Sequence, residues 1–285
     1  MVPGPFEYFA PRTLGAAIKI LGDHRDDVKI LSGGQSLLPL MKMRLSKPGF
    51  IVDIGRIPDL DSIVEADNSL IIGALVTHAE IESSDLLKSK CPLLPKTATT
   101  IADVQVRNRG TIGGSIAHAD PAGDWPAAIV ALDAEIKIAG PRGERWVKCD
   151  EFFLGLLMSV LEPDEIVTAV KVPVTGADKT AYLKAAPRSS GFAVVGVAVR
   201  LTIDSAGTCS RAAIGITGVT DKTYRPERVE QMLTGKPLDS AIIQQAAAEA
   251  CRNVVPIEDI NGSAEYRKQM TEVYVARAIE DALRT

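Results

Sequence analysis

Two pairs of adjacent glycines, far apart in the chain, constrain its folding more than any other feature. The first pair lies in the segment SGGQS at 32–36, directly after the apolar run Val28–Leu31, and the second lies in TIGGS at 111–115. Glycine lacks a Cβ atom, so its backbone adopts positive φ angles and approaches other groups closely. Successive amides in such turns can point inward together and form a concave anion site. Because Ser or Thr hydroxyls flank both pairs, the two loops together predict a grip on the two halves of a diphosphate.

The composition is that of an ordinary globular protein, with 46% apolar and 24% charged residues among 285, which is enough for two domains with separate cores. The 32 Lys and Arg residues against 36 Asp and Glu residues give a net charge of −4, which argues against nucleic-acid or anionic-membrane binding. The N-terminus has no basic segment before an apolar core, and no apolar stretch reaches the roughly eighteen residues that a membrane span needs. We therefore expect a cytoplasmic protein with no signal peptide and no membrane span.

The cysteines and histidines are too scattered to predict a metal centre or a disulfide framework, because such sites normally show closer spacing. No two cysteines have the Cys-x-x-Cys spacing. The residues are Cys91, Cys149, Cys209, Cys251, His24, His78 and His118.

Periodicity and turn residues predict an α+β chain in which a β-α-β subdomain comes first. The first expected elements are a helix over 14–21 capped by Thr13, strands over 28–31 and 50–54, and a short helix from Leu37 capped by Ser36. The next are strands over 69–74, 134–139 and 165–172, helices over 77–83, 95–104 and 125–132, and strand and loop together over 111–118. After a linker at 175–178 come strands over 180–185, 192–203 and 209–218 and helices over 225–233, 239–253 and 263–283.

The glycine loops leave alternatives open. Neither matches the G-x-G-x-x-G dinucleotide fingerprint or the phosphate loop of nucleotide hydrolases, so Gly33 and Gly34 are also compatible with a plain strand-to-helix turn. Asp124 can cap the helix over 125–132, accept hydrogen bonds from ribose hydroxyls, or do both.

Other polar residues are equally undecided from the residues alone. Arg107 and Arg109 can face a diphosphate, a protein partner or solvent, and Lys184 is compatible with a solvated edge lysine. Ser36, His118 and Asp124 can be named as a triad, but no nucleophile-elbow sequence supports one.

Three segments resemble a known family. SGGQSLLPLMKMRL, VRNRGTIGGSIAHADPAGDWPA and GSAEYRKQM are similar to the FAD-binding medium subunit of molybdenum hydroxylases, the group of aerobic carbon monoxide dehydrogenase and bacterial xanthine and aldehyde dehydrogenases. The resemblance runs essentially end to end. It implies an FAD-binding domain of the vanillyl-alcohol-oxidase (PCMH) type at 1–176, in two parts (1–57 and 58–176). It also implies a smaller domain at 177–285, of the carbon monoxide dehydrogenase flavoprotein type, with a three-stranded antiparallel sheet and helices.

The resemblance also implies a function. The chain would carry non-covalent FAD, accept electrons from a small [2Fe-2S] subunit next to a large molybdopterin subunit, and pass them to a final acceptor. The expected assembly is a dimer of heterotrimers. The implied cofactor-binding residues are Ser32, Gly33, Gly34, Gln35, Ser36, Thr111, Ile112, Gly113, Gly114, Ser115, Asp124 and Lys184. Phe192 falls where some relatives have a tryptophan close to the flavin ring.

The sequence departs from some carbon monoxide dehydrogenases, which have His at Gln35 and an acidic residue at Ser115, so the resemblance does not specify the substrate. It also lacks the cysteine cluster of the 4-hydroxybenzoyl-CoA reductases. Quinone, oxygen and NAD all remain open as acceptors. The alternatives from other classes are a self-contained flavin reductase that uses NAD(P)H and a non-catalytic nucleotide-binding module.

Overall fold

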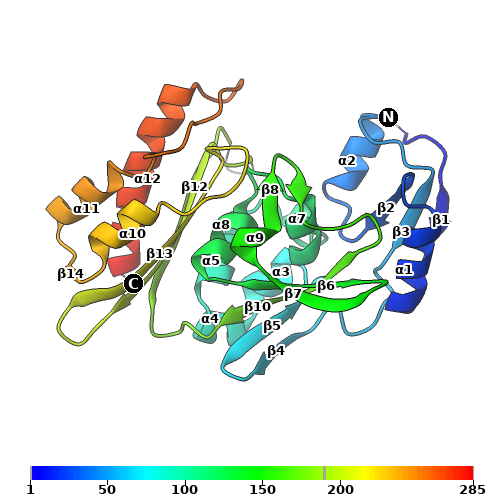
Figure 1. The fold of residues 1–285 in the computed structure, drawn as a ribbon, viewed down its shortest axis with the longest axis horizontal. Helices are drawn as coiled ribbons and strands as arrows, with labels where there is room; N and C mark the ends of the chain where they lie inside the picture. Colours follow the sequence, from blue (N-terminus) through cyan, green and yellow to red (C-terminus); the bar gives the residue numbers. More distant parts are fainter. Residues whose placement is uncertain (1, 189–190, 285) are drawn as a thin grey trace.

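The N-terminal unit of the chain is a small parallel sheet with two helices. The computed structural model describes residues 2–188 and 191–284, which form three hydrophobic clusters in three units arranged in a row (Figure 1). In the first unit β3 is the central strand and pairs in parallel with β1 and β2. Thr13 caps α1 as expected, because its Oγ1 accepts a hydrogen bond from the Ala16 amide at 3.2 Å. The elements are β1 (Glu7–Phe9), α1 (Leu14–Asp23), β2 (Val28–Leu31), α2 (Leu37–Lys42) and β3 (Phe50–Asp53).

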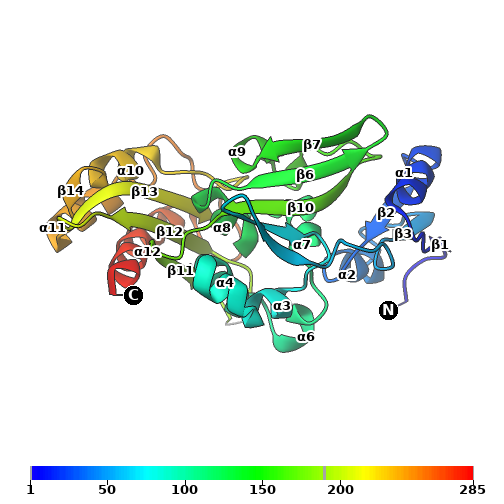
Figure 2. The same cartoon turned by 90° about the horizontal axis from the view of Figure 1, so that it is seen from below.

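The middle unit is a five-stranded antiparallel sheet, in the order β4-β5-β10-β6-β7, with helices packed on it (Figure 2). Alternating strand residues such as Leu70 and Ile72 are buried against helix residues such as Ile116 and Trp125. The strands are β4 (Ile63–Ala66), β5 (Ser69–Gly73), β6 (Glu135–Gly140), β7 (Gly143–Lys148), β8 (Phe153–Gly155), β9 (Met158–Ser159) and β10 (Ile166–Pro173). The helices are α3 (His78–Ser83), α4 (Asp85–Lys90), α5 (Leu93–Thr99), α6 (Val104–Arg107), α7 (Ile112–His118), α8 (Asp124–Ala131) and α9 (Cys149–Phe152).

The C-terminal unit contains the expected three long antiparallel strands, with a two-residue fourth strand at one edge. Helix α12 packs on β11 and β12, while α8 of the middle unit packs on β12 and β13. At Gly215 there is no room for a side chain, because a Cβ atom would lie 2.1 Å from the Ala127 carbonyl oxygen of α8. The elements are β11 (Lys179–Ala185), β12 (Val195–Ile203), β13 (Thr208–Thr217), α10 (Glu227–Leu233), β14 (Lys236–Pro237), α11 (Ser240–Ala247) and α12 (Ala264–Arg284).

Several expected elements are corrected. The segment 111–118 forms the helix α7 rather than strand and loop. The helix expected over 95–104 ends at Thr99, because Ala102 has a φ of +43° and interrupts the chain before α6. The helix expected over 239–253 ends at Ala247. Within the described ranges, no helix is long and apolar enough to cross a membrane.

Candidate functional site

The two glycine loops, separated by more than seventy positions in the chain, meet in the folded protein. Ser32 Oγ and Thr111 Oγ1 lie 2.8 Å apart and share a hydrogen bond. A Cβ atom on Gly33 would lie 2.2 Å from the Arg109 carbonyl oxygen, so only glycine permits this approach of the two backbones. A Cβ atom on Gly114 would point toward Thr111 Oγ1, at 2.8 Å, and toward Ser32, at 3.5 Å. The structure therefore brings the two predicted loops into one site.

The first loop has free amides. In the described part of the chain, the backbone N–H groups from Gly33 to Ser36 donate to no protein acceptor, and Gly34 has a φ of +74°. Unpaired donors on a turn of this kind form a cup for an anion. Ser36 is the N-cap residue of α2, as expected, but its backbone angles are helical and its side chain makes no capping hydrogen bond.

In the second loop, the amides of Ile112, Gly113 and Gly114 donate hydrogen bonds to acceptors within the protein. The Ile112 and Gly113 amides donate to the Val76 and Ala74 carbonyls, each at 3.0 Å, and the Gly114 amide donates to Thr111 Oγ1 at 3.1 Å. A Cβ atom on Gly113 would lie 2.4 Å from that of Ala74. The expectation of inward-pointing free amides is therefore wrong for this loop. What it offers a ligand is the hydroxyl groups and the bare backbone of Gly114.

Asp124 and Lys184 form a buried ion pair. Lys184 Nζ lies 3.1 Å from Asp124 Oδ1 and also donates to the Thr100 carbonyl at 2.7 Å. The Tyr182 hydroxyl donates to Asp124 Oδ1 at 2.5 Å. The expectation that Asp124 caps α8 is wrong, since Gly123 is the N-cap and makes no side-chain bond. The side chain of Lys184 is 6% exposed, so the solvated-lysine interpretation is wrong as well.

Burial shifts the pKa values of Asp124 and Tyr182. It raises the pKa of Asp124, an effect that the charge of Lys184 and the Tyr182 hydroxyl oppose. Burial and the adjacent Asp124 carboxylate raise the pKa of Tyr182 well above its usual value, so its hydroxyl stays protonated and donates.

The other candidates from the sequence separate into structural and open positions. Arg107 is structural, because it pairs with Glu82 at 2.8 Å and donates to the Ile101 carbonyl. Arg109 is exposed and forms no ion pair with any described residue. His118 ends α7 and is partly exposed. Phe192 is 64% exposed, so it is not a core residue.

The triad that could be named from the sequence is not assembled. Among the described residues, no hydrogen bond joins Ser36, His118 and Asp124, and both Asp124 oxygens are engaged by Tyr182 and Lys184.

His78 is a site residue that the sequence did not reveal. Its Nδ1 accepts a hydrogen bond from Trp125 Nε1 at 3.1 Å, and a Cβ atom on Gly110 would lie 2.6 Å from its Nε2. Burial lowers its pKa from 6.5 to about 4, so the ring is neutral where it lies against Gly110, directly before the second loop. The only sequence signal nearby is the capping box of Thr77 and Glu80, which positions the helix and not the ring.

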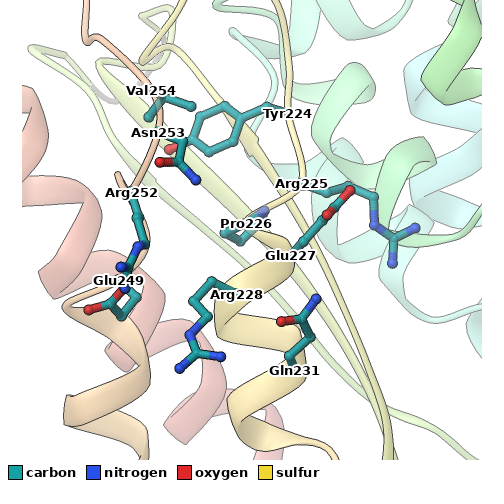
Figure 3. Close-up of a pocket in the computed structure, with 10 residues that line it drawn as sticks. All are labelled: Tyr224, Arg225, Pro226, Glu227, Arg228, Gln231, Glu249, Arg252, Asn253 and Val254. Atoms are coloured by element: carbon teal, nitrogen blue, oxygen red, sulfur yellow. The ribbon is translucent and has the colours of Figure 1, made fainter.

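Two cavities of the protein are lined by no residue of the glycine loops. One, of about 380 Å³, lies between α10 and the segment after α11, with Arg228 and Arg252 in its wall (Figure 3). The other, of about 310 Å³, lies beside the C-terminal end of α2 and includes Met41 and Arg44. No cluster of metal-ligating side chains occurs among residues 2–188 and 191–284, and all four cysteines are free and buried.

Comparison with known families decides between the possible ligands. Residues 4–175 match the family described as the FAD binding domain in molybdopterin dehydrogenase, and residues 180–282 match the CO dehydrogenase flavoprotein C-terminal domain. The chain belongs to the molybdopterin dehydrogenase flavoprotein family.

Members of this flavoprotein family are similar to the chain over its whole length. The carbon monoxide dehydrogenase medium chain of Hydrogenophaga pseudoflava is 40% identical, over 99% of this chain and 98% of the relative. The 6-hydroxypseudooxynicotine dehydrogenase complex subunit alpha of Paenarthrobacter nicotinovorans is 37% identical, over 99% and 96%. A solved structure of the Hydrogenophaga pseudoflava carbon monoxide dehydrogenase superposes with a TM-score of 0.97 and covers 100% of this chain and 99% of the matched chain.

Proposed function

We propose that this chain is the FAD-carrying electron-transfer subunit of a multi-subunit molybdenum hydroxylase. The observation that carries the proposal is the meeting of the two glycine loops at Ser32 and Thr111. In the first loop, the amides of Gly33–Ser36 have no acceptor among the described residues. These are the donors that a diphosphate requires. The chain belongs to a family of FAD-binding domains, so we infer that the diphosphate is that of FAD.

The residues of the two loops fit this cofactor, and different groups would bind different parts of it. The amides from Gly33 to Ser36 would hold phosphate oxygens. Ser115 would add a hydroxyl donor, and the pair Ser32–Thr111 would add one more, because one proton of that pair is used in their shared hydrogen bond. Gly114 would leave the gap between the loops open, because its missing Cβ atom faces Ser32. The remaining predicted contacts, from Gln35, Ile112, Gly113, Asp124 and Lys184, are proposed on the family resemblance. When bound, FAD would supply the redox chemistry, because a flavin can accept electrons one at a time and pass them on in pairs. The protein would supply binding and orientation.

The finer assembly is also a proposal. We infer a large molybdopterin subunit and a small [2Fe-2S] subunit as partners, a dimer of heterotrimers, a cytoplasmic location and non-covalent FAD. The domain division at 1–176 and 177–285 is supported by the extents of the two family matches. The relatives act on compounds as different as carbon monoxide and 6-hydroxypseudooxynicotine, so the substrate stays open. They give no support to a self-contained NAD(P)H reductase.

Co-expression tests the assembly. The tagged chain, produced together with its genomic neighbours, should co-purify with two further subunits and with molybdenum and iron measured by elemental analysis. In the control, the tagged chain is co-expressed with an unrelated operon in place of its genomic neighbours. A chain that never retains either metal would contradict the proposed assembly and leave only flavin binding to be tested.

A further inference from the structure

The turn between α7 and α8 is held by the C-terminal unit. The Pro121 carbonyl accepts hydrogen bonds from Thr217 Oγ1 at 2.5 Å and from the Gly218 amide at 2.7 Å. Thr217 Oγ1 also reaches the Gly123 carbonyl at 2.9 Å, and the Ala193 amide donates to the Ala122 carbonyl at 3.2 Å. Three successive carbonyls of this turn, which directly precedes Asp124, therefore have their partners in the C-terminal unit.

The Asp124 side chain depends on the same unit. Tyr182 and Lys184 project from β11, two positions apart, and both donate to its carboxylate. Tyr182 is 5% exposed, and Gly196 on the neighbouring strand leaves space for its hydroxyl, since a Cβ atom there would lie 2.6 Å from Tyr182 Oη. Glycine at position 196 therefore leaves room for the Tyr182 hydroxyl and for Thr217 Cγ2, which would lie 2.7 Å from the same Cβ atom.

A buried carboxylate is costly unless charged and hydrogen-bonding groups compensate it. At 7% exposure, Asp124 finds that compensation in Tyr182 and Lys184. The position and charge of Asp124 are consequently set by the docking of the C-terminal sheet, not by the α7–α8 segment alone.

We propose that Tyr182 is a positioning residue for the flavin site, and that through Tyr182 and Thr217 the docking of the C-terminal sheet is coupled to FAD binding. This inference rests on the proposed function, in which FAD contacts the glycine loops and Asp124. A coupling of this kind is reciprocal: a docked sheet favours FAD binding, and bound FAD favours the docked sheet.

The coupling predicts that the pH dependence of FAD binding changes when the Tyr182 hydroxyl is removed. The charged groups that face Asp124 are Lys184 from β11 and Asp120 from its own turn, and the Tyr182 hydroxyl donates to it. The Tyr182 hydroxyl holds the pKa of Asp124 down, so removing it raises that pKa further. Protonation of Asp124 removes its charge and turns one oxygen into a donor, which weakens the hydrogen bonds that the carboxyl group can accept from ribose hydroxyls. In Tyr182→Phe, FAD binding should therefore begin to weaken at a higher pH than in the wild type.

The test is FAD titration of the full-length apoprotein, followed by flavin fluorescence quenching between pH 5 and pH 8. We expect Tyr182→Phe to weaken FAD binding about tenfold at pH 7, the range for a hydrogen bond to a charged group, and to move the acid limb of binding to higher pH. The control is Tyr224→Phe, which removes the hydroxyl of a partly buried tyrosine that donates to the Ala250 carbonyl at 3.1 Å, within the C-terminal unit.

A second variant guards against a folding defect. Thr217→Val keeps the side-chain shape and removes the bonds to Pro121 and Gly123, so it should also weaken FAD binding while leaving the pH profile unmoved. If wild-type protein binds FAD and both variants bind it with wild-type affinity and pH profile, the coupling is overturned. If wild-type protein binds no FAD, the proposed function itself fails.

Discussion

Gly33 is the residue at which the two loops of the site come closest. A Cβ atom there meets the backbone of Arg109 and Gly110, which cannot move aside as a flexible side chain would. Amino-acid type alone was enough to mark this position, because two glycines after a strand predict a special backbone. It did not reveal the partner, which comes from a segment distant in the chain.

We predict that Gly33→Ala separates the loops. It should lower the free energy of unfolding by about 1–3 kcal/mol, as overpacking against backbone does, and weaken FAD binding at least tenfold. Urea denaturation and FAD titration measure the two effects. The matched control is Gly22→Ala in α1, where a Cβ atom meets nothing within 4 Å. Wild-type FAD affinity in Gly33→Ala would contradict the geometry of the site.

His78 makes stability depend on pH. Its pKa is about 4 in the folded protein and 6.5 as a free side chain, so below pH 6.5 the unfolded chain takes up a proton that the folded chain refuses. Stability is therefore complete above pH 6.5 and falls as pH drops toward 4, by roughly 3 kcal/mol at 1.4 kcal/mol per pH unit.

Urea denaturation at pH 7 and pH 4.5 checks this expectation. His78→Gln should shrink the difference between the two values, since an amide oxygen can still accept from Trp125 without titrating. His118→Gln, at a partly exposed position, serves as the control. An unchanged difference in His78→Gln would show that other groups cause the acid instability.

Helix α7 illustrates, at the level of the element, why part of the site escaped sequence reasoning. Two glycines and the β-branched Thr111 and Ile112 have low helix propensity, so the sequence of this segment predicts a strand and a loop. Tertiary bonds override that propensity: the Ala74 and Val76 carbonyls take up the first amides, and Thr111 caps the helix. The Ala74 and Val76 carbonyls lie more than thirty positions away in the chain, so no local pattern shows them.

The C-terminal strands, in contrast, were predictable. Their apolar runs are long and end at turn residues, and β11, β12 and β13 form within a few residues of the expected bounds. The residues alone did not show that Lys184 is buried, because its partners, Asp124 and the Thr100 carbonyl, lie 60 and 84 positions away.

Thr111 joins the helix to the loop contact, and we predict that Thr111→Ala disrupts both. Its Oγ1 accepts from the Gly114 amide and pairs with Ser32 Oγ. The loss of a cap and a part-buried hydrogen bond should cost about 1–2 kcal/mol and reduce FAD retention through purification. Thr111→Ser keeps the hydroxyl and should behave as wild type in thermal denaturation. Equal loss in both variants would indicate that the methyl group matters instead.

At the scale of the whole molecule, polar contacts tie the middle unit to the C-terminal unit. Asp133, just after α8, lies within an ion-pair distance of Arg200, Arg211 and Arg225, all from the C-terminal unit. These contacts, with the packing of α8 on β13, set the relative placement of the two units on which the Asp124 network depends.

We predict that Asp133→Asn loosens this docking modestly. Because Asp133 is more than a third exposed, solvent screens the cluster, and the loss should be about 1 kcal/mol and shrink in high salt. Glu65→Gln, which breaks an exposed pair with Lys90 inside the middle unit, is the control and should change stability by less than about 0.5 kcal/mol. If Asp133→Asn and Glu65→Gln lowered the free energy of unfolding in urea equally, the Asp133 cluster would not stabilise the docking of the two units.

The most direct test of the central claim is an absorption spectrum of the purified full-length chain, repeated on the supernatant after acid precipitation. We expect flavin bands that move into the supernatant and a released flavin that chromatography identifies as FAD, because two loops built for a diphosphate hold it without a covalent bond. A chain that shows no flavin bands, even after incubation with excess FAD, would contradict the account.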